Sequence, residues 1–291
     1  MDIITKYQDY TRAYHLAEST RNTYLSEFKA FRAFYPKEDL RSISRDKIIV
    51  YLARLYDQGY SDSKVNQAIN AIKFYKERVL QQKRSTYFIK RPRRKKFIPP
   101  ILSEKKMFEI ISSIKNPKHR TLIYTIYMNG LRRSELVGLK LQDVRSKAEY
   151  PHLVIRMSKH GSSRLLYIDQ EFTATLRSYY LKYRPKLYFF EGATPGKPIS
   201  ETSIARILDR AMKNNGVTER FRVHDLRHNF ATHCLLNGTS IYDLSKFLGH
   251  RSVETTEKYY AHLLPSEIRI NRPIQPRCEK NVISINRRIR A

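Results

Sequence analysis

A basic stretch that divides the chain constrains its fold more than any other feature. Eight of the fourteen residues from 83 to 96 are lysine or arginine, and none of them is acidic. Pro92, Pro99 and Pro100 interrupt regular structure within and just after this stretch. Dense positive charge together with proline is typical of a connecting segment. We therefore predict a linker over residues 83–100 that separates two folded domains.

The residues before this linker show the apolar spacing of helices. Tyr24, Phe28 and Phe31 lie three or four positions apart, after a Ser-Thr pair that can cap a helix. Two similar stripes run over residues 48–55 and 65–75. The aromatic side chains on these stripes are expected to form a core. Residues 1–82 thus predict a small helical domain whose helices have polar outer faces.

The residues after the linker combine helical spacing with a short region of strand-like alternation. Apolar and polar residues alternate over residues 153–157 and 164–168, which predicts two strands joined by a turn. A short third strand is expected over residues 187–190. Helices are expected from Ser103 onward, over 122–127, and around 170–183, 201–214, 224–237 and 240–248. The fold class is therefore mostly α with a small β-sheet, with an α+β domain over 101–265 and a basic, irregular tail over 266–291.

The charge balance indicates a polyanionic partner. Lysine and arginine total 56 against 27 acidic residues, which gives a formal net charge of +29. Nucleic acid is favoured over a membrane surface, although a solvated basic surface is the plain alternative. Phosphate contacts are predicted for the linker and for Lys64 on a helix face, where a solvated side chain is an equally good interpretation. The linker candidates are Lys90, Arg91, Arg93, Arg94, Lys95 and Lys96.

No feature of the sequence indicates export or membrane insertion. The N-terminus has no apolar stretch typical of a signal peptide, and no apolar run is long enough to span a bilayer. Cys234 and Cys278 form neither a CxxC pair nor a disulfide framework. We expect a cytoplasmic, DNA-associated protein of a prokaryotic cell, in a reducing compartment and without a membrane partner.

Six residues after the linker could together attack a DNA phosphodiester. Such a reaction without a metal needs a nucleophile, cations for the non-bridging oxygens, a base for the nucleophile's proton and an acid for the departing 5′ oxygen. Five cationic or proton-carrying side chains and one phenol supply these groups, so no metal and no cofactor are expected. The six are Arg132, Lys159, His224, Arg227, His250 and Tyr259.

The two arginines suit the binding of phosphate oxygens, because a guanidinium stays charged and can grip two oxygens at once. Glu135 lies three positions after Arg132, on the same face of a helix, and can orient it. Arg133 is the competing choice, and an ordinary Arg–Glu helix pair is the plain alternative. His224 and Arg227 are also three apart, so one helix face would present both.

The remaining three candidates lie at turns and at helix ends. Lys159 is expected at a hairpin tip, where a mobile lysine could protonate the 5′ oxygen, although lysines in turns are common. His250 follows a Leu-Gly stop and could donate to a non-bridging oxygen. Tyr259 follows His250 by nine residues, and the adjacent Tyr260 leaves the nucleophile ambiguous.

Taken together, these segments resemble the tyrosine recombinase (phage integrase) family. Gly130-Leu131-Arg132-Arg133-Ser134-Glu135-Leu136 is similar to its first arginine box, and residues 224–233, His-Asp-Leu-Arg-His-Asn-Phe-Ala-Thr-His, resemble its second. The twelve residues from Leu248 to Tyr259 resemble the segment that ends at the nucleophile, and they begin with Leu248-Gly249-His250. The similarity covers about residues 101–264, with a looser helical match to the core-binding domain over 15–80.

The resemblance implies a site-specific DNA recombinase. Tyr259 would form a 3′-phosphotyrosyl link, and the family spacing from His250 favours it over Tyr260. Arg132, Arg227 and His250 would stabilise the transition state, with Lys159 as general acid, His224 as base or positioning group and Glu135 supporting Arg132. Two departures from the family pattern are His160, where a glycine is common, and the doubled tyrosine.

The same resemblance implies an assembly. It predicts a C-shaped clamp around double-stranded recombination sites, a homotetramer on DNA, and strand exchange through a Holliday junction without ATP. The tail over 266–291 could dock on a neighbouring subunit, and accessory DNA-bending proteins could take part. We favour the integrase of a mobile element over a chromosome resolvase. A type IB topoisomerase-like relaxing enzyme and a non-catalytic DNA-binding regulator are the alternatives.

Overall fold

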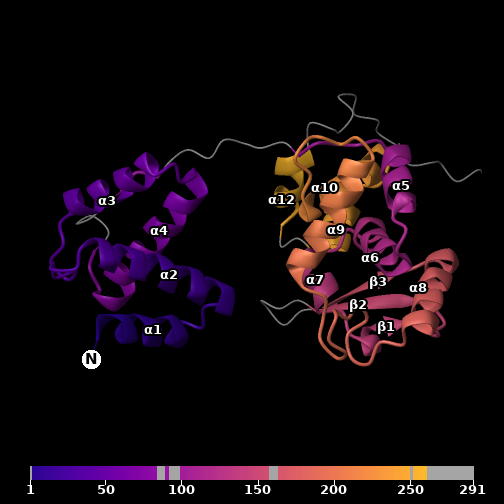
Figure 1. Ribbon diagram of the computed structural model, residues 1–291, viewed down its shortest axis with the longest axis horizontal. Helices are drawn as coiled ribbons and strands as arrows, with labels where there is room; N and C mark the ends of the chain where they lie inside the picture. The colour runs from indigo at the N-terminus through magenta and orange to yellow at the C-terminus, as the bar shows by residue number, and fades with distance from the viewer. Residues whose placement is uncertain (1, 84–88, 92–98, 157–162, 250–251, 261–291) are drawn as a thin grey trace, which may run out of the picture. The chain divides into compact units, whose positions relative to one another are not determined.

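The computed structural model describes residues 2–83, 89–91, 99–156, 163–249 and 252–260, without the side chains of Thr255, Lys258 and Tyr259. The chain forms two compact units, one within residues 1–98 and one that begins at Pro99 (Figure 1). Both units are mostly helical, and the second contains a small antiparallel sheet. This confirms the predicted fold class. The C-shaped clamp concerns the placement of one unit against the other, and it stays a prediction.

The first unit is a helical bundle around an aromatic core. Tyr7 stacks on Phe28 with ring centroids 4.2 Å apart, and its hydroxyl donates to the carbonyl oxygen of Ala71 at 3.1 Å. Phe28 and Phe31 are fully buried, as their helical spacing predicts, whereas Phe34 is partly exposed. The helices are α1 (Ile3–Ala13), which the apolar stripes did not predict, α2 (Glu18–Phe34), α3 (Arg45–Asp57), α4 (Asp62–Phe74) and a π-helical turn at Tyr75–Val79.

The second unit starts with helices whose caps are local. Ser103 caps its first helix by accepting a hydrogen bond from the Lys106 amide, and Asn116 caps the next through the amides of Lys118 and His119. The elements are α5 (Glu104–Ser113), α6 (Pro117–Met128), α7 (Arg133–Val137), a 3₁₀ turn (Leu141–Asp143), β1 (Val144–Arg145), β2 (His152–Arg156), β3 (Ser163–Tyr167), α8 (Gln170–Tyr183), α9 (Glu201–Asn214), α10 (Val223–Leu236), α11 (Ile241–Leu248) and α12 (Val253–Tyr260).

The sheet has the order β1-β2-β3, and both pairings are antiparallel. Leu153 of β2 lies opposite Leu166 of β3, and both side chains are buried, so one face of this sheet belongs to the core. The strand predicted over 187–190 is only an isolated bridge from Tyr188 to Lys140. The apolar residues of this segment pack in the core instead, where Phe189 and Phe190 are both buried.

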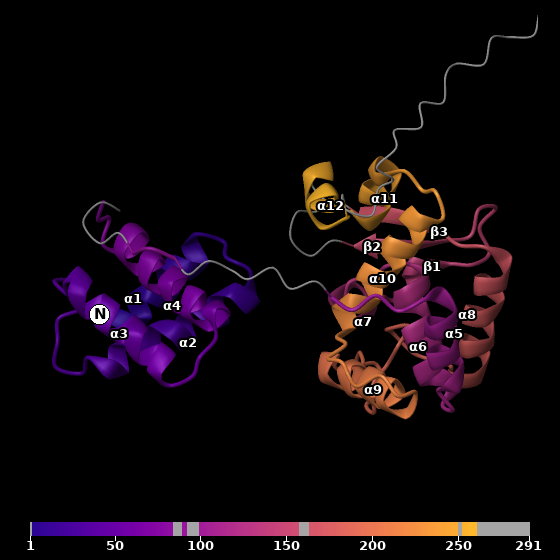
Figure 2. The ribbon, with the colours of Figure 1, turned by 90° about the horizontal axis from the view of Figure 1, so that it is seen from above.

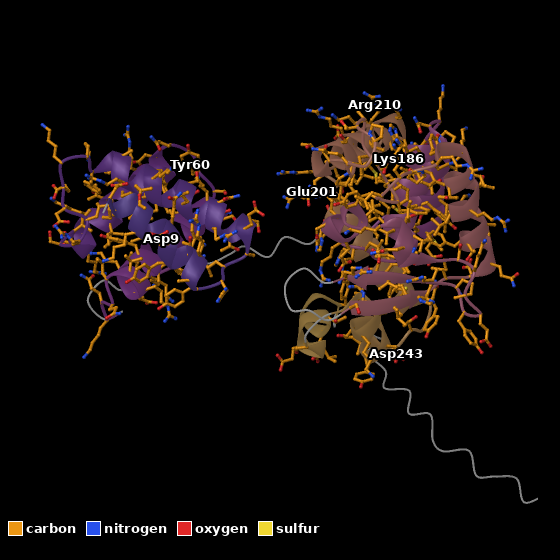
Figure 3. All side chains as sticks on the ribbon, turned by 90° about the horizontal axis from the view of Figure 1, so that it is seen from below. Asp9, Tyr60, Lys186, Glu201, Arg210 and Asp243 are labelled. Carbon is orange, nitrogen blue, oxygen red and sulfur yellow. The ribbon has the colours of Figure 1, made fainter. Side chains whose placement is uncertain are left out.

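Helix α10 has most of its residues buried in the second unit, and six of these buried residues are polar or charged. α9 lies at one end of this unit, and α11 and α12 lie at the opposite end (Figure 2). The labelled side chains show the same arrangement, with Glu201 and Arg210 of α9 far from Asp243 of α11 (Figure 3).

In the part of the chain that is described, no helix has the length and apolar character to cross a membrane.

Candidate active site

The site begins where α6 ends. Gly130 has a φ of +54°, a left-handed conformation that favours glycine. A Cβ atom at this position would lie 2.6 Å from a ring carbon of Phe230, so a larger residue would also clash. The resulting turn places Arg132 at the N-cap of the short helix α7, with its side chain one third exposed. The turn at residues 130–132 therefore places the Arg132 guanidinium at the edge of the core, where solvent can reach it.

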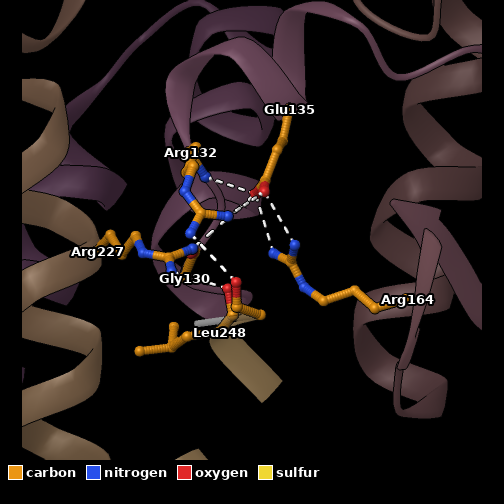
Figure 4. A network of polar contacts seen from close by, with 7 residues as sticks. Gly130, Arg132, Glu135, Arg164, Arg227 and Leu248 are labelled. Atoms are coloured by element: carbon orange, nitrogen blue, oxygen red, sulfur yellow. Dashed lines mark hydrogen bonds and ion pairs between the residues drawn. The ribbon is translucent and has the colours of Figure 1, made fainter. Parts of the chain in front are cut away.

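Glu135 lies in the first turn of α7 and binds Arg132 in two ways. Its carboxylate accepts the backbone N–H of Arg132 at 2.8 Å and the Nη1 of the same residue at 2.7 Å. Arg132 Nη2 also lies 3.4 Å from the carbonyl oxygen of Gly249. The structure thus places Glu135 where it orients Arg132 (Figure 4). Arg133, the competing arginine, turns away and forms an ion pair with Glu201 instead.

Arg227 lies deep in the same cluster, with only 3% of its side chain exposed. Its Nη1 donates to the Gly130 carbonyl and its Nη2 to the Leu248 carbonyl, both at 2.8 Å. These two bonds join α10 to the ends of α6 and α11. Glu135 is 3.9 Å away. Burial and the charge of Arg132 lower the pKa of Arg227 to about 9, which still leaves the guanidinium charged at neutral pH.

Arg164 on β3 completes the cluster, and the sequence analysis did not assign it to the site. Its two terminal nitrogens donate to the two carboxylate oxygens of Glu135, each at 2.9 Å. The residue is two positions from the buried Leu166, so the alternation of a strand puts both on one face. That alternation was the available signal: an arginine on the apolar face of a strand needs a buried partner.

The carboxylate of Glu135 is therefore shared by several guanidinium groups. Burial raises the pKa of Glu135, but the hydrogen bonds and charge of Arg164, and then those of Arg132, outweigh it and lower the pKa to about 2. One negative charge faces three positive charges from Arg132, Arg164 and Arg227. The cluster keeps an excess of positive charge beside the partly exposed Arg132, which suits a phosphate group.

His224 lies at the start of α10, one turn before Arg227, and keeps part of its surface exposed to solvent. Desolvation by the surrounding protein, followed by the positive charge of Arg227, lowers its pKa below the ordinary 6.5. The nearby charge of Arg132 acts in the same direction. The lowered pKa favours the neutral imidazole, and a neutral imidazole can accept a proton.

Three of the predicted site residues lie wholly or partly outside the description. Lys159 falls between β2 and β3, and His250 follows Gly249, and both are outside the described residues. Tyr259 is described only by its backbone, in the last turn of α12. Among the predicted residues with described side chains, Arg132, Glu135 and Arg227 lie in one cluster, and the charges of both arginines act on His224.

Tyr260, the alternative nucleophile, is a buried side chain. Its ring stacks on His228 with centroids 4.8 Å apart, and its hydroxyl lies 2.9 Å from the Nδ1 of that histidine. Only 5% of the residue is exposed. These contacts hold the last turn of α12 against α10. A phenol packed in this way serves as an anchor beside Tyr259.

The predicted phosphate-binding side chains of the first unit and the linker are only partly described. Lys64 forms an ion pair with the buried Glu27, which occupies its ammonium group. Arg91 is exposed and donates to the Asn70 side chain of α4 at 2.8 Å, and Lys90 is exposed. The other linker candidates, Arg93, Arg94, Lys95 and Lys96, fall outside the described residues, as does the tail over 266–291.

Family profiles match both units of the chain. The profile described as the phage integrase family matches residues 101–267, and that of the phage integrase N-terminal SAM-like domain matches residues 3–86. The tyrosine recombinase XerD of Halalkalibacterium halodurans is 28% identical over 244 residues, which is 79% of this chain and 80% of the relative.

Solved structures share the fold at lower identity. A lambda integrase tetramer bound to a Holliday junction has a TM-score of 0.73 and 16% identity, and the match covers 91% of this chain and 78% of that one. The Tn1549 transposon integrase in complex with transposon right end DNA has a TM-score of 0.65 and 18% identity. That match covers 90% of this chain and 95% of the integrase.

Proposed function

Because this chain belongs to the phage integrase family, we propose that it cuts and rejoins double-stranded DNA at specific sites through a covalent 3′-phosphotyrosyl intermediate. It is a tyrosine-type site-specific recombinase, like the XerD protein to which it is similar. The observation that carries the chemical proposal is the cluster of Arg132 and Arg227 around the single carboxylate of Glu135.

The proposed first step is an attack on the scissile phosphate. The Tyr259 oxygen bonds to phosphorus, the bond from phosphorus to the 5′ oxygen breaks, and His224 or water takes the phenol proton. Arg132 holds a non-bridging oxygen, and His250 donates to another. Lys159 gives a proton to the departing 5′ oxygen. The phosphotyrosine keeps the bond energy, so the reverse attack by a 5′ hydroxyl rejoins DNA without ATP.

The burial of Tyr260 supports the choice of its neighbour as the nucleophile. The Tyr260 hydroxyl contacts His228 within the core, and reaching a DNA phosphate would break both this contact and the ring stacking. The guanidinium of Arg132, by contrast, is accessible from outside. Tyr259 therefore remains the proposed nucleophile, with its anchor one residue away.

The assembly proposed for this chain follows its fold relatives. The lambda integrase structure is a tetramer on a Holliday junction, and the Tn1549 integrase is bound to transposon DNA. We propose for this chain a homotetramer on two DNA sites, with strand exchange through a Holliday junction and a mobile element as the source of one site. Docking of the 266–291 tail on a neighbouring subunit and accessory DNA-bending proteins stay predictions.

A nicked suicide substrate tests the covalent step. DNA from the flanks of the chain's own gene is incubated with the protein in chelator and resolved on a denaturing gel. We expect a covalent protein–DNA band that Tyr259→Phe abolishes and Tyr260→Phe retains. Loss of the band only in Tyr260→Phe would reassign the nucleophile. Bound DNA without any band would favour a non-catalytic regulator, and relaxation of plasmid without exchange would favour a topoisomerase.

A further inference from the structure

Arg164 makes contacts that a surface salt bridge would not make. The arginine is only 11% exposed, and each of its two terminal nitrogens donates to a different oxygen of Glu135 at 2.9 Å. Parallel N–H···O bonds of this kind fix the position and the plane of a carboxylate. Arg132 binds the same carboxylate through one side-chain nitrogen and one backbone amide. Glu135 is therefore held between Arg164 on one side and Arg132 on the other.

Arg164 also packs against the turn that precedes His250. A Cβ atom placed on Gly249 would lie 3.0 Å from the Nη1 of Arg164 and 3.2 Å from its Cδ. Gly249 has a φ of +66°, so the left-handed turn and the arginine both require a residue without a side chain. The Leu248 carbonyl one residue earlier accepts from Arg227. The Arg164 side chain thus contacts both Glu135 and the end of α11.

The electrostatic contributions at Glu135 also indicate that Arg164 is its main partner. Among the groups that favour the charged form of Glu135, Arg164 contributes most, ahead of Arg132. Without it, one carboxylate would face the two remaining arginines, with its outer side empty of donors. The carboxylate could then rotate, and Arg132 would lose the partner that fixes its guanidinium.

On this basis, and resting on the proposed function, we propose that Arg164 is a positioning residue for DNA cleavage. It holds the Glu135 carboxylate, and Glu135 in turn sets the Arg132 guanidinium against the scissile phosphate. Arg164 itself does not touch DNA, because its side chain is largely buried and its two terminal nitrogens bind Glu135 (Figure 4). Its loss should reduce the rate of the chemical step while DNA binding is preserved.

The test compares Arg164→Met and Arg164→Lys with a matched control on the same sheet. Arg156 of β2 also pairs with a buried carboxylate and lies outside the arginine cluster. Its two nitrogens share one oxygen of Asp143, at 2.8 and 2.7 Å, and its side chain is 60% exposed. The single-turnover cleavage rate on the suicide substrate and the Kd for the same DNA are measured for each variant, at a temperature where melting curves show it folded.

A misplaced catalytic group costs on the order of 100-fold in rate, so we expect about that loss for Arg164→Met. Arg164→Lys should lose about 10-fold or more, since an ammonium cannot form the two parallel bonds. DNA affinity should change less than about threefold, as for Arg156→Met. If Arg164→Met cleaves as fast as wild type, the proposal is wrong.

Two further readouts separate positioning from general loss of structure. The rate losses of Arg164→Met and Glu135→Gln should be far from additive, because both act through the same carboxylate. A 5′-bridging phosphorothioate has a leaving group that needs no proton, so it should rescue Lys159→Ala but not Arg164→Met. Additive losses, or rescue of Arg164→Met by sulfur, would overturn the assigned route through Glu135 and Arg132.

Failure of the proposed function would look different from failure of this inference. If wild-type protein binds its DNA but forms no covalent complex, the recombinase chemistry itself is wrong. If wild-type protein cleaves and only the Arg164 variants fail to show the expected loss, the positioning role alone is wrong.

Discussion

Replacing Glu135 by glutamine should destabilise the second unit strongly, and in a manner that depends on pH. The side chain is 6% exposed and is held by Arg132 and Arg164. Water therefore cannot compensate these arginines for the loss of the carboxylate charge. Its pKa falls from 4.5 to about 2 in the folded protein. That shift corresponds to about 3 kcal/mol of stability at neutral pH, since the folded state holds the proton less tightly than the unfolded chain.

The sign of the pH dependence follows from the direction of the pKa shift. The folded pKa lies below the unfolded value, so the contribution of Glu135 is complete above about pH 5.5 and is lost as pH falls from 4.5 toward 2. About 1.4 kcal/mol of it should be gone at pH 3.5. The stability difference between wild type and Glu135→Gln should therefore be constant from pH 7 to about 5.5 and shrink below that.

Urea unfolding followed by circular dichroism at several pH values measures this difference. Glu201→Gln is the control, because Glu201 is about half exposed and pairs with Arg133 outside the buried cluster, so its effect should stay below about 1 kcal/mol. An equal destabilisation by Glu135→Gln at pH 6 and pH 3.5 would refute the linkage argument. A loss below about 1 kcal/mol at pH 7 would refute the assigned strength of the cluster.

Three other changes give separate tests. Tyr260→Phe should keep the covalent DNA band and cost about 1 kcal/mol in urea unfolding, because it removes the hydroxyl contact with His228 but leaves the ring. Gly130→Ala should cost several kcal/mol in the same assay, since the added methyl meets Phe230 in a left-handed backbone. The cleavage rate should fall on acidification with a pKa below 6.5, and His224→Gln should abolish that limb in a rate–pH series.

The local features of this fold were legible in the sequence, because they depend on neighbouring residues. Ser103 caps α5 through an amide three residues away, and the helical spacing of Phe28 and Phe31 places both in the core. Gly130 and Gly249 take the left-handed conformations that end their helices. Each of these depends on interactions within about one or two turns of the chain.

The arrangement of the site depends on contacts between distant residues, and this part could not be read in advance. Glu135 and Arg132 are three apart, and their pairing is a helix contact. Arg164 reaches the same carboxylate across 29 positions, from a different element. Likewise, nothing local to Tyr260 predicts that it stacks on His228, 32 residues earlier. The packing of α12 on α10 is what places the Tyr260 side chain inward.

Helix α10 shows why a polar face can be misread as a solvated one. Asn229 and His233 lie on the same helix as Arg227, yet all three are buried. Asn229 accepts from the Leu102 amide and donates to the Pro100 carbonyl, while His233 binds the Leu102 carbonyl at 2.8 Å. The helix that carries Arg227 therefore also fixes the segment that follows the basic stretch. Buried amides and imidazoles need hydrogen-bond partners. The polar residues of α10 are therefore explained by hydrogen bonds to residues 100–102, which pack across the helix, and not by contact with water.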